Sequence, residues 1–153
     1  MNRDVCNGFL EALALLNDGC NHGCQYSLET LPKATSLDDA LASYFSSMST
    51  SRIPPQSAAT WNIRTESLQG GWTAELEVVL RRWFFAQEFS PTVDPDLAAV
   101  VVAHFLGHLC ETVGDARAYR LRVSPPMWYE CAWEDYVFDA RGDRWLLHLG
   151  FSD

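Results

Sequence analysis

The residues best suited to chemistry lie in one short run, Cys20-Asn-His22-Gly-Cys24, which holds two thiols and an imidazole. Thiolates and imidazoles are the usual ligands of structural zinc, which takes four of them in a tetrahedron. No second pair of cysteines or histidines follows at the spacing of a zinc finger, so a fourth ligand would have to come from a distant part of the fold. We therefore expect an ordinary loop with two thiols here, and a metal site or a Cys20–Cys24 disulfide are the alternatives.

A second pair, His104 and His108, is spaced four residues apart within an apolar segment. Two imidazoles at this spacing share one face of a helix and can hold a metal ion. The glutamate that follows the first histidine in metalloprotease helices is replaced here by Phe105. A role in packing or in a polar seam of the helix is the simpler expectation, and metal binding or acid–base catalysis are the alternatives.

Signatures of nucleophilic and phosphate-binding enzymes are absent from the sequence. There is no Gly-x-Ser-x-Gly elbow, and Gly70-Gly71 is not followed by the Lys-Ser/Thr pair of a phosphate loop. The adjacent carboxylates Glu134 and Asp135 would point to opposite faces of a strand, which argues against a shared acid–base site. The sequence therefore predicts a protein that is not an enzyme and that carries no cofactor and no metal.

The charge balance points to a basic partner. The 153 residues carry a net charge of −9, from 20 acidic and 11 basic residues, which disfavours nucleic acids and anionic membranes. The five cysteines are an odd number, which favours a reducing compartment, and the N-terminal apolar stretch contains Glu11, which a secretory signal would not. The longest apolar run, residues 97–110, is short for a membrane span and contains two histidines. We therefore expect a cytoplasmic protein.

The last 37 residues predict three β-strands, at 117–123, 127–139 and 144–153. Pro125-Pro126 separates the first two, and residues 140–143 form a short hairpin loop between the second and the third. The second and third strands carry seven aromatic side chains, interleaved with carboxylates. Three such strands in succession form an antiparallel meander, which needs helices over one face to be stable.

This aromatic and acidic hairpin is the best candidate for a binding surface. Tryptophan and tyrosine are typical anchors of protein interfaces, and carboxylates guide a basic partner towards them. Neither face of the second strand is purely apolar, as expected if one face packs on helices and the other meets a partner. The predicted contact residues are Glu130, Trp133, Glu134, Asp135 and Asp139. The alternative is that the aromatic rings form core and the carboxylates a solvated rim.

Helical periodicity predicts four helices, at about 3–16, 36–48, 73–88 and 94–113, with capping signals at Ser36 and Asp94. Between them we expect irregular chain at 18–35, an exposed loop at 49–60 and a short edge strand or extended segment at 61–67. The fourth helix is apolar nearly all round, so we place it at the buried centre. These elements predict a single α+β domain, residues 1–153, with about four helices packed on a C-terminal three-stranded antiparallel sheet.

The C-terminal hairpin, residues 128–139 followed by 145–153, resembles that of small acidic immunity proteins of bacterial toxin systems. Members of such families bind a cognate toxin in the cytoplasm and block it, and the resemblance implies the same activity here without assigning any site residue. We therefore predict a non-catalytic cytoplasmic inhibitor that binds and occludes a basic toxin or effector protein. The alternatives are a phage-encoded inhibitor of a nucleic-acid-binding defence complex, a small metal-binding enzyme and an oligomerising module.

Overall fold

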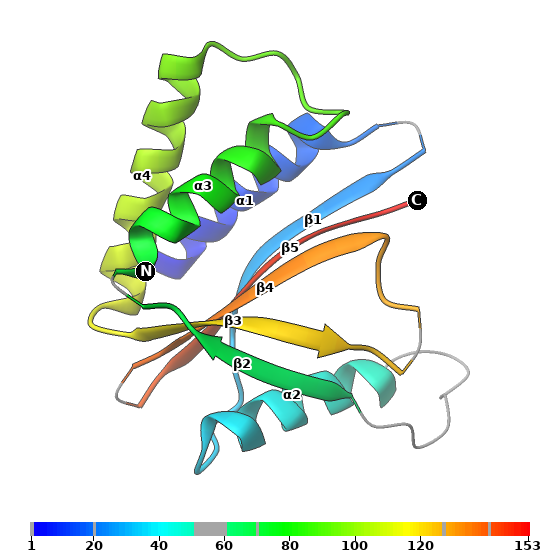
Figure 1. The fold of residues 1–153 in the computed structure, drawn as a ribbon, viewed down its shortest axis with the longest axis vertical. Helices are drawn as coiled ribbons and strands as arrows, with labels where there is room; N and C mark the ends of the chain where they lie inside the picture. Colours follow the sequence, from blue (N-terminus) through cyan, green and yellow to red (C-terminus); the bar gives the residue numbers. More distant parts are fainter. Residues whose placement is uncertain (1, 20, 51–60, 70, 127, 141) are drawn as a thin grey trace.

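The computed structural model describes residues 2–19, 21–50, 61–69, 71–126, 128–140 and 142–153. Over these residues the chain forms four helices and five strands, which confirms the predicted α+β class (Figure 1). The helices are α1 (Asn2–Asn17), α2 (Leu37–Thr50), α3 (Trp72–Phe85) and α4 (Pro95–Val113). The strands are β1 (Gly23–Thr30), β2 (Asn62–Ser67), β3 (Arg117–Ser124), β4 (Ala132–Asp139) and β5 (Arg144–Ser152). The loop predicted at 49–60 lies largely outside the described residues.

The five strands form one antiparallel sheet in the order β1-β5-β4-β3-β2. Strands β3, β4 and β5 are the predicted C-terminal meander, but the prediction of a three-stranded sheet is wrong. Strand β1 adds an edge beyond β5, and β2 adds the opposite edge beyond β3. Strand β2 confirms the edge strand expected at 61–67, although it starts one residue later, and most of its side chains are exposed.

Strand β1 lies in the stretch 18–35 that the sequence analysis predicts to be irregular, and this prediction is also wrong. Cys24, Tyr26 and Leu28 are buried, whereas Gln25 between them is exposed. This period of two is that of a strand with only one face on a core. The strand pairs with β5 along its whole length, so an N-terminal segment lies beside the C-terminal strand.

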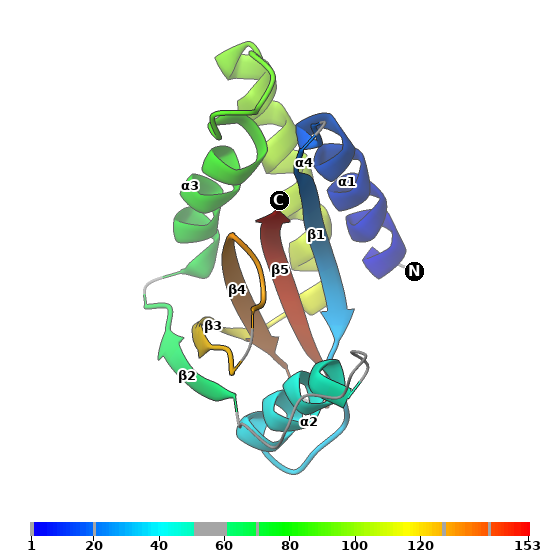
Figure 2. The same cartoon turned by 90° about the vertical axis from the view of Figure 1, so that its right-hand side faces the viewer.

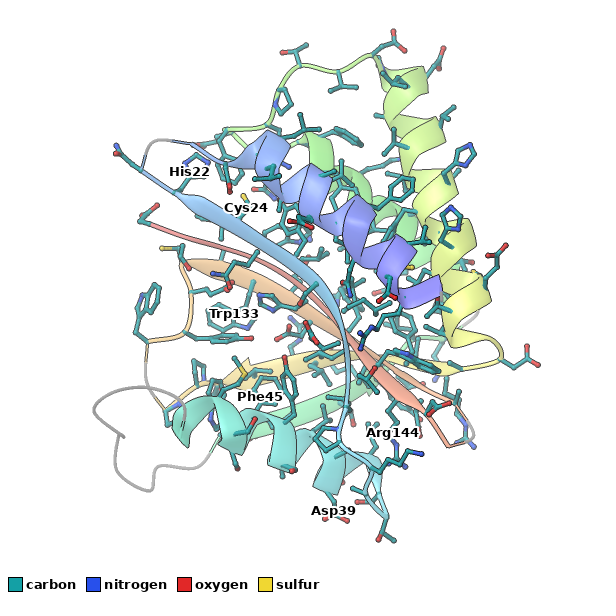
Figure 3. All side chains as sticks on the ribbon, turned by 180° about the vertical axis from the view of Figure 1, so that it is seen from behind. His22, Cys24, Asp39, Phe45, Trp133 and Arg144 are labelled. Atoms are coloured by element: carbon teal, nitrogen blue, oxygen red, sulfur yellow. The ribbon has the colours of Figure 1, made fainter. Side chains whose placement is uncertain are left out.

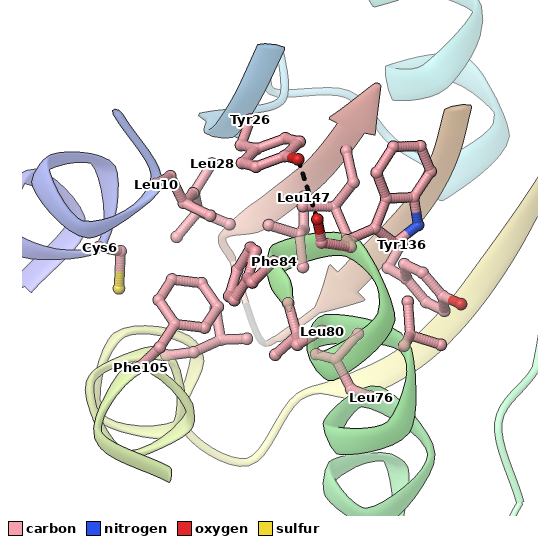
Figure 4. Packing of buried hydrophobic residues seen from close by; sticks show 14 of the residues in the cluster. Cys6, Leu10, Tyr26, Leu28, Leu76, Leu80, Phe84, Phe105, Tyr136 and Leu147 are labelled. Carbon is pink, nitrogen blue, oxygen red and sulfur yellow. Dashed lines mark hydrogen bonds between the residues drawn. The ribbon is translucent and has the colours of Figure 1, made fainter. Parts of the chain in front are cut away.

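Helices cover both faces of the sheet in unequal layers (Figure 2). Helices α1, α3 and α4 pack on one face, which we call the three-helix face, and α2 packs alone on the other, the α2 face. On the three-helix face, Leu10, Phe84, Phe105 and Leu147 belong to one large apolar cluster (Figure 4). The smaller cluster on the α2 face contains Leu41 and Phe45 of α2 and Val137 and Leu146 of the sheet.

Hydrogen bonds confirm two of the predicted helix starts. The hydroxyl of Ser36 accepts from the amide N–H of Asp39 at 3.1 Å and donates to the carboxylate of the same residue at 2.7 Å. The carboxylate of Asp94 accepts from the amides of Asp96 and Leu97 at 2.9 and 3.2 Å. Both arrangements satisfy amide groups that the first turn of a helix leaves without partners.

Helix α4 is not the buried centre that its composition predicts. A single stripe of it is buried, and Leu97 and Val100 are 55% and 52% exposed. The helix lies at the outside of the three-helix layer, where one face meets α1 and α3 (Figure 1). By length and composition alone α4 would be able to cross a membrane, which is weak support for such a role in a single helix.

Candidate functional site

A buried histidine on the α2 face is the centre of the candidate site. Along β5, Leu147 and Leu149 face the three-helix core, so His148 between them points to the opposite face. In the register of the sheet His148 stands directly opposite Asp135 of β4. Nδ1 of His148 lies 2.7 Å from Oδ1 of Asp135, which is the distance of a strong, charge-assisted hydrogen bond.

A second carboxylate reaches the same ring from the connection before β4. Oε1 of Glu130 lies 3.1 Å from Nε2 of His148, so the two imidazole nitrogens are held by two different acids. The Glu130 carboxylate lies over Gly150, where a Cβ would collide with its Oε2 atom. Glycine at this position therefore leaves the space that Glu130 occupies.

The three charged side chains are almost completely removed from solvent. The exposed fractions are 1% for Asp135, 9% for Glu130 and 7% for His148. Burial by itself would lower the pKa of the His148 imidazole, but the hydrogen bonds and charges of Asp135 and Glu130 outweigh it and raise the pKa to about 10. The imidazole is therefore a cation at neutral pH, and with both carboxylates ionised the cluster carries one net negative charge.

Each carboxylate keeps one open oxygen. Within the described parts of the chain, Oε2 of Glu130 and Oδ2 of Asp135 are buried and have no hydrogen-bond partner. A buried acceptor without a donor is costly and uncommon in folded proteins, so each one calls for an explanation, such as a bound water, an ion or a functional role. The hydroxyl of Tyr129 lies 3.4 Å from Nδ1 of His148, close to the side that Asp135 already occupies.

A pocket of about 200 Å³ opens beside this cluster, between α2, β1, β5 and the chain before β4. Its lining includes Gln25, Ser27, Tyr44, Met48, Trp128, Tyr129, Glu130, His148 and Ser152. Burial raises the pKa of the Tyr44 phenol to about 12, and the charges of Glu29 and Asp135 add to the effect. The phenol is therefore neutral at physiological pH, and the space beneath α2 has a negative potential.

The predicted contact residues are divided between two faces of the sheet. Asp135 and Glu130 lie inside on the α2 face. Half-buried Trp133 lies on the same side of the sheet (Figure 3). Its ring packs edge-to-face on Tyr129, with 5.2 Å between the ring centroids. Glu134 points to the three-helix face instead. These residues do not form one continuous acidic surface, and their contact with a partner stays a prediction.

Two of the predicted contact residues bind groups of this chain. Glu134 accepts hydrogen bonds from the guanidinium of Arg82 and, at 2.6 Å, from the indole N–H of Trp83. Asp139 accepts from Nε of Arg144 at 2.8 Å, at the far end of β4. Both acids therefore have structural roles in tying the sheet to α3 and β4 to β5.

The cluster around Cys20 is only partly within the described residues, since Cys20 itself lies outside them. Nε2 of His22 lies 2.7 Å from the backbone carbonyl of Asn17, and Sγ of Cys24 lies 3.6 Å from the same oxygen. The His22 ring also stacks on Phe89, with centroids 4.3 Å apart. In this arrangement the imidazole and the Cys24 thiol help to close the end of α1.

The pair on α4 is divided between solvent and packing. His104 is exposed, whereas His108 packs on the ring of Phe9, with centroids 5.7 Å apart, and its Nδ1 lies 3.8 Å from the Glu111 carboxylate. Across the described ranges, no group of three His, Cys, Asp or Glu side chains is placed to hold a metal ion. The Asp135–His148–Glu130 cluster is not such a group either, because the imidazole ring lies between its two carboxylates.

The geometry of the buried cluster suits binding better than proton transfer. A general base needs a ring nitrogen directed at the substrate, and both nitrogens of His148 are engaged by carboxylates. Of the two carboxylates that keep an open oxygen, Glu130 is the one that lines the pocket. His148 is not among the residues predicted from the sequence, although a polar residue between two leucines in an apolar strand indicates a second, polar face.

Comparisons with models of known protein families, with curated proteins and with solved structures find no match for this chain.

Proposed function

We propose that this protein is a non-catalytic inhibitor of the immunity type, which acts in the cytoplasm by binding a basic toxin or effector protein and covering its working surface. The observation that carries the proposal is the Glu130 carboxylate, which is buried beside an aromatic pocket with one oxygen unpaired within the described chain. Such an acceptor suits a cationic group brought by another molecule.

The net charge of the whole chain also supports binding to a basic partner. A net charge of −9 speeds encounter with a basic partner and repels nucleic acid. Trp128 is 59% exposed beside the pocket and offers the kind of large aromatic surface that anchors protein interfaces. Charge thus favours approach, and the aromatic rim favours a specific contact.

The proposal is tested by affinity capture from the native host, followed by reconstitution with the purified captured protein. We expect a stoichiometric complex with a basic protein, loss of that protein's activity in the complex, and weaker association at higher salt. A captured nucleic-acid-binding complex would support the phage-type inhibitor instead. Turnover of a small substrate by the protein alone, or a captured partner that stays fully active in the complex, would contradict the proposal.

A further inference from the structure

We propose that the pocket beneath α2 is a receptor for a single arginine side chain of the partner, with the Glu130 carboxylate accepting from its guanidinium. This assignment rests on the proposed function only for the source of the arginine. The pocket, the open acceptor and the surrounding charge are properties of this chain alone.

The first argument is the acceptor itself. The Glu130 side chain is 5% exposed and lines the pocket, and His148 satisfies only its Oε1 atom, so Oε2 is left as a buried acceptor that packs over Gly150. Gly150 holds this arrangement open, because any larger residue there would push the carboxylate away. The fold thus places a carboxylate with one unpaired oxygen beside the pocket.

The second argument is charge. Glu130 and Asp135 share the one imidazolium of His148, so the ionised cluster is one positive charge short of neutrality. Glu29 on β1 adds to the negative potential that acts on Tyr44 of α2. A guanidinium in the pocket would neutralise the cluster, and the low dielectric of a buried site strengthens the interaction.

The third argument is size and shape. A volume of about 200 Å³ is below the range of drug-sized ligand pockets, and it suits one long side chain. Tyr44, Trp128 and Tyr129 supply aromatic surface, and Met48 supplies a polarisable apolar wall for an aliphatic stem. Ser27 and Ser152 also line the pocket, and serine carries hydroxyl and carbonyl oxygens that can accept hydrogen bonds.

These features favour arginine over lysine. A guanidinium is planar, carries five donors in a fork, stacks on aromatic faces and is less strongly hydrated than an ammonium group. A pocket that combines aromatic walls with several separated acceptors uses all of these properties. An ammonium group would use only the carboxylate.

The test is an NMR titration of the isotope-labelled protein with N-acetyl-arginine amide. The neutral isostere N-acetyl-citrulline amide and N-acetyl-lysine amide are the comparison probes. We expect the arginine probe to bind with a Kd on the order of millimolar and to shift the indole N–H of Trp128 and the ring of His148. The citrulline probe should cause no such shifts, and the lysine probe should bind more weakly.

Two variants locate the interaction. Glu130→Gln should weaken the arginine probe at least about tenfold, the equivalent of one lost charged contact, whereas Glu66→Gln, with the same change of net charge on exposed β2, should leave it unchanged. Trp128→Ala changes an exposed side chain, so it should weaken binding without perturbing the fold. It therefore tests the pocket even if Glu130→Gln does not fold.

Equal binding of the arginine and citrulline probes, equal affinity of the wild type and Trp128→Ala, or shifts confined to another surface would overturn the proposal. The outcome is independent of the partner experiment. An inhibitory complex without arginine binding would refute the pocket assignment alone, and arginine binding without an inhibited partner would refute the function alone.

Discussion

Asp135 and His148 are directly opposed residues of β4 and β5, and their side chains meet on the α2 face at 2.7 Å between Oδ1 and Nδ1. The register of two central strands thus fixes the geometry of a buried ion pair, and the ring then presents Nε2 to Glu130. Buried charges of this kind are costly to desolvate, and they are tolerated only while every partner is present. This dependence makes the cluster open to a direct test.

Replacing the imidazole alone should be strongly destabilising. His148→Gln removes the positive charge and leaves Asp135 and Glu130 buried without it, so we expect a loss of about 3–5 kcal/mol in the free energy of unfolding. Urea unfolding followed by tryptophan fluorescence measures this loss. The matched control is the triple variant Glu130→Gln, Asp135→Asn, His148→Gln, which keeps the shapes without the charges. It should recover most of the stability, and a triple variant as unstable as the single one would show that charge is not the cause.

Stability should fall as the pH rises from neutral towards alkaline. The pKa of His148 is raised from 6.5 to about 10 in the folded protein, so the folded chain holds this proton more tightly than the unfolded chain. The resulting stabilisation is complete below about pH 6.5 and is lost progressively as the pH rises through about 10. The denaturation midpoint of the wild type, measured across this window, should therefore fall with increasing pH relative to that of the neutral triple variant. Parallel curves would mean that the imidazole is not the group responsible.

The helix cap at Asp94 should contribute a measurable and separable increment of stability. Asp94→Ala removes the acceptor of the Asp96 and Leu97 amides, and we expect a cost of about 1 kcal/mol. Asp96→Ala is the control, since it removes a first-turn charge that interacts with the helix dipole but leaves both capping bonds in place. It should cost about 0.3–1 kcal/mol and should depend more on salt. Equal costs with equal salt dependence would assign the effect to charge alone.

The sequence predicted the helices well, because their signals are local. The apolar periodicity and the hydrogen-bonding caps at Ser36 and Asp94 act within a few residues, and the structure has both. Strand β1 was missed because half of it is polar and because it becomes a strand only through its pairing with β5, more than a hundred residues away. Local patterns carry no information on such a partner.

The prediction that α4 is the buried centre of the fold was wrong for a different reason. Its apolar residues on all sides indicate burial, but the three-helix layer buries only the stripe that contains Phe105 and Leu109. The exposure of Leu97 and Val100 depends on how many helices surround α4, and this number is a property of the whole fold.

The candidate site was only partly predictable. Glu130 and Asp135 were selected as acids among aromatic residues of a strand predicted at 127–139. In an unbroken strand these two residues would point to opposite faces, but β4 starts only at Ala132. Glu130 lies before it and turns to the α2 face, where it meets Asp135. The role of His148 depends on the register of β4 and β5, which the sequence did not specify.

The cost in stability of adding a side chain at Gly150 should depend on the presence of Glu130. Gly150 does not have a positive φ, so its backbone accepts alanine, and the cost of Gly150→Ala comes from the collision of the new Cβ with the Glu130 carboxylate. We expect a loss of about 1–3 kcal/mol in the wild-type background, as for other overpacked cores.

In the Glu130→Ala background the same substitution should be nearly neutral. The carboxylate is then gone, the gain from replacing a strand glycine is about 0.5–1 kcal/mol, and the approach of the new Cβ to Nε2 of His148 offsets it. The double-mutant cycle, measured by urea unfolding, should therefore give a coupling energy of about 1–3 kcal/mol. Gly8→Ala on the exposed side of α1, where a Cβ meets nothing within 4 Å, is the control and should stabilise both backgrounds equally. A Gly150→Ala cost that is the same with and without Glu130 would place the carboxylate elsewhere and would remove the acceptor from the proposed arginine pocket.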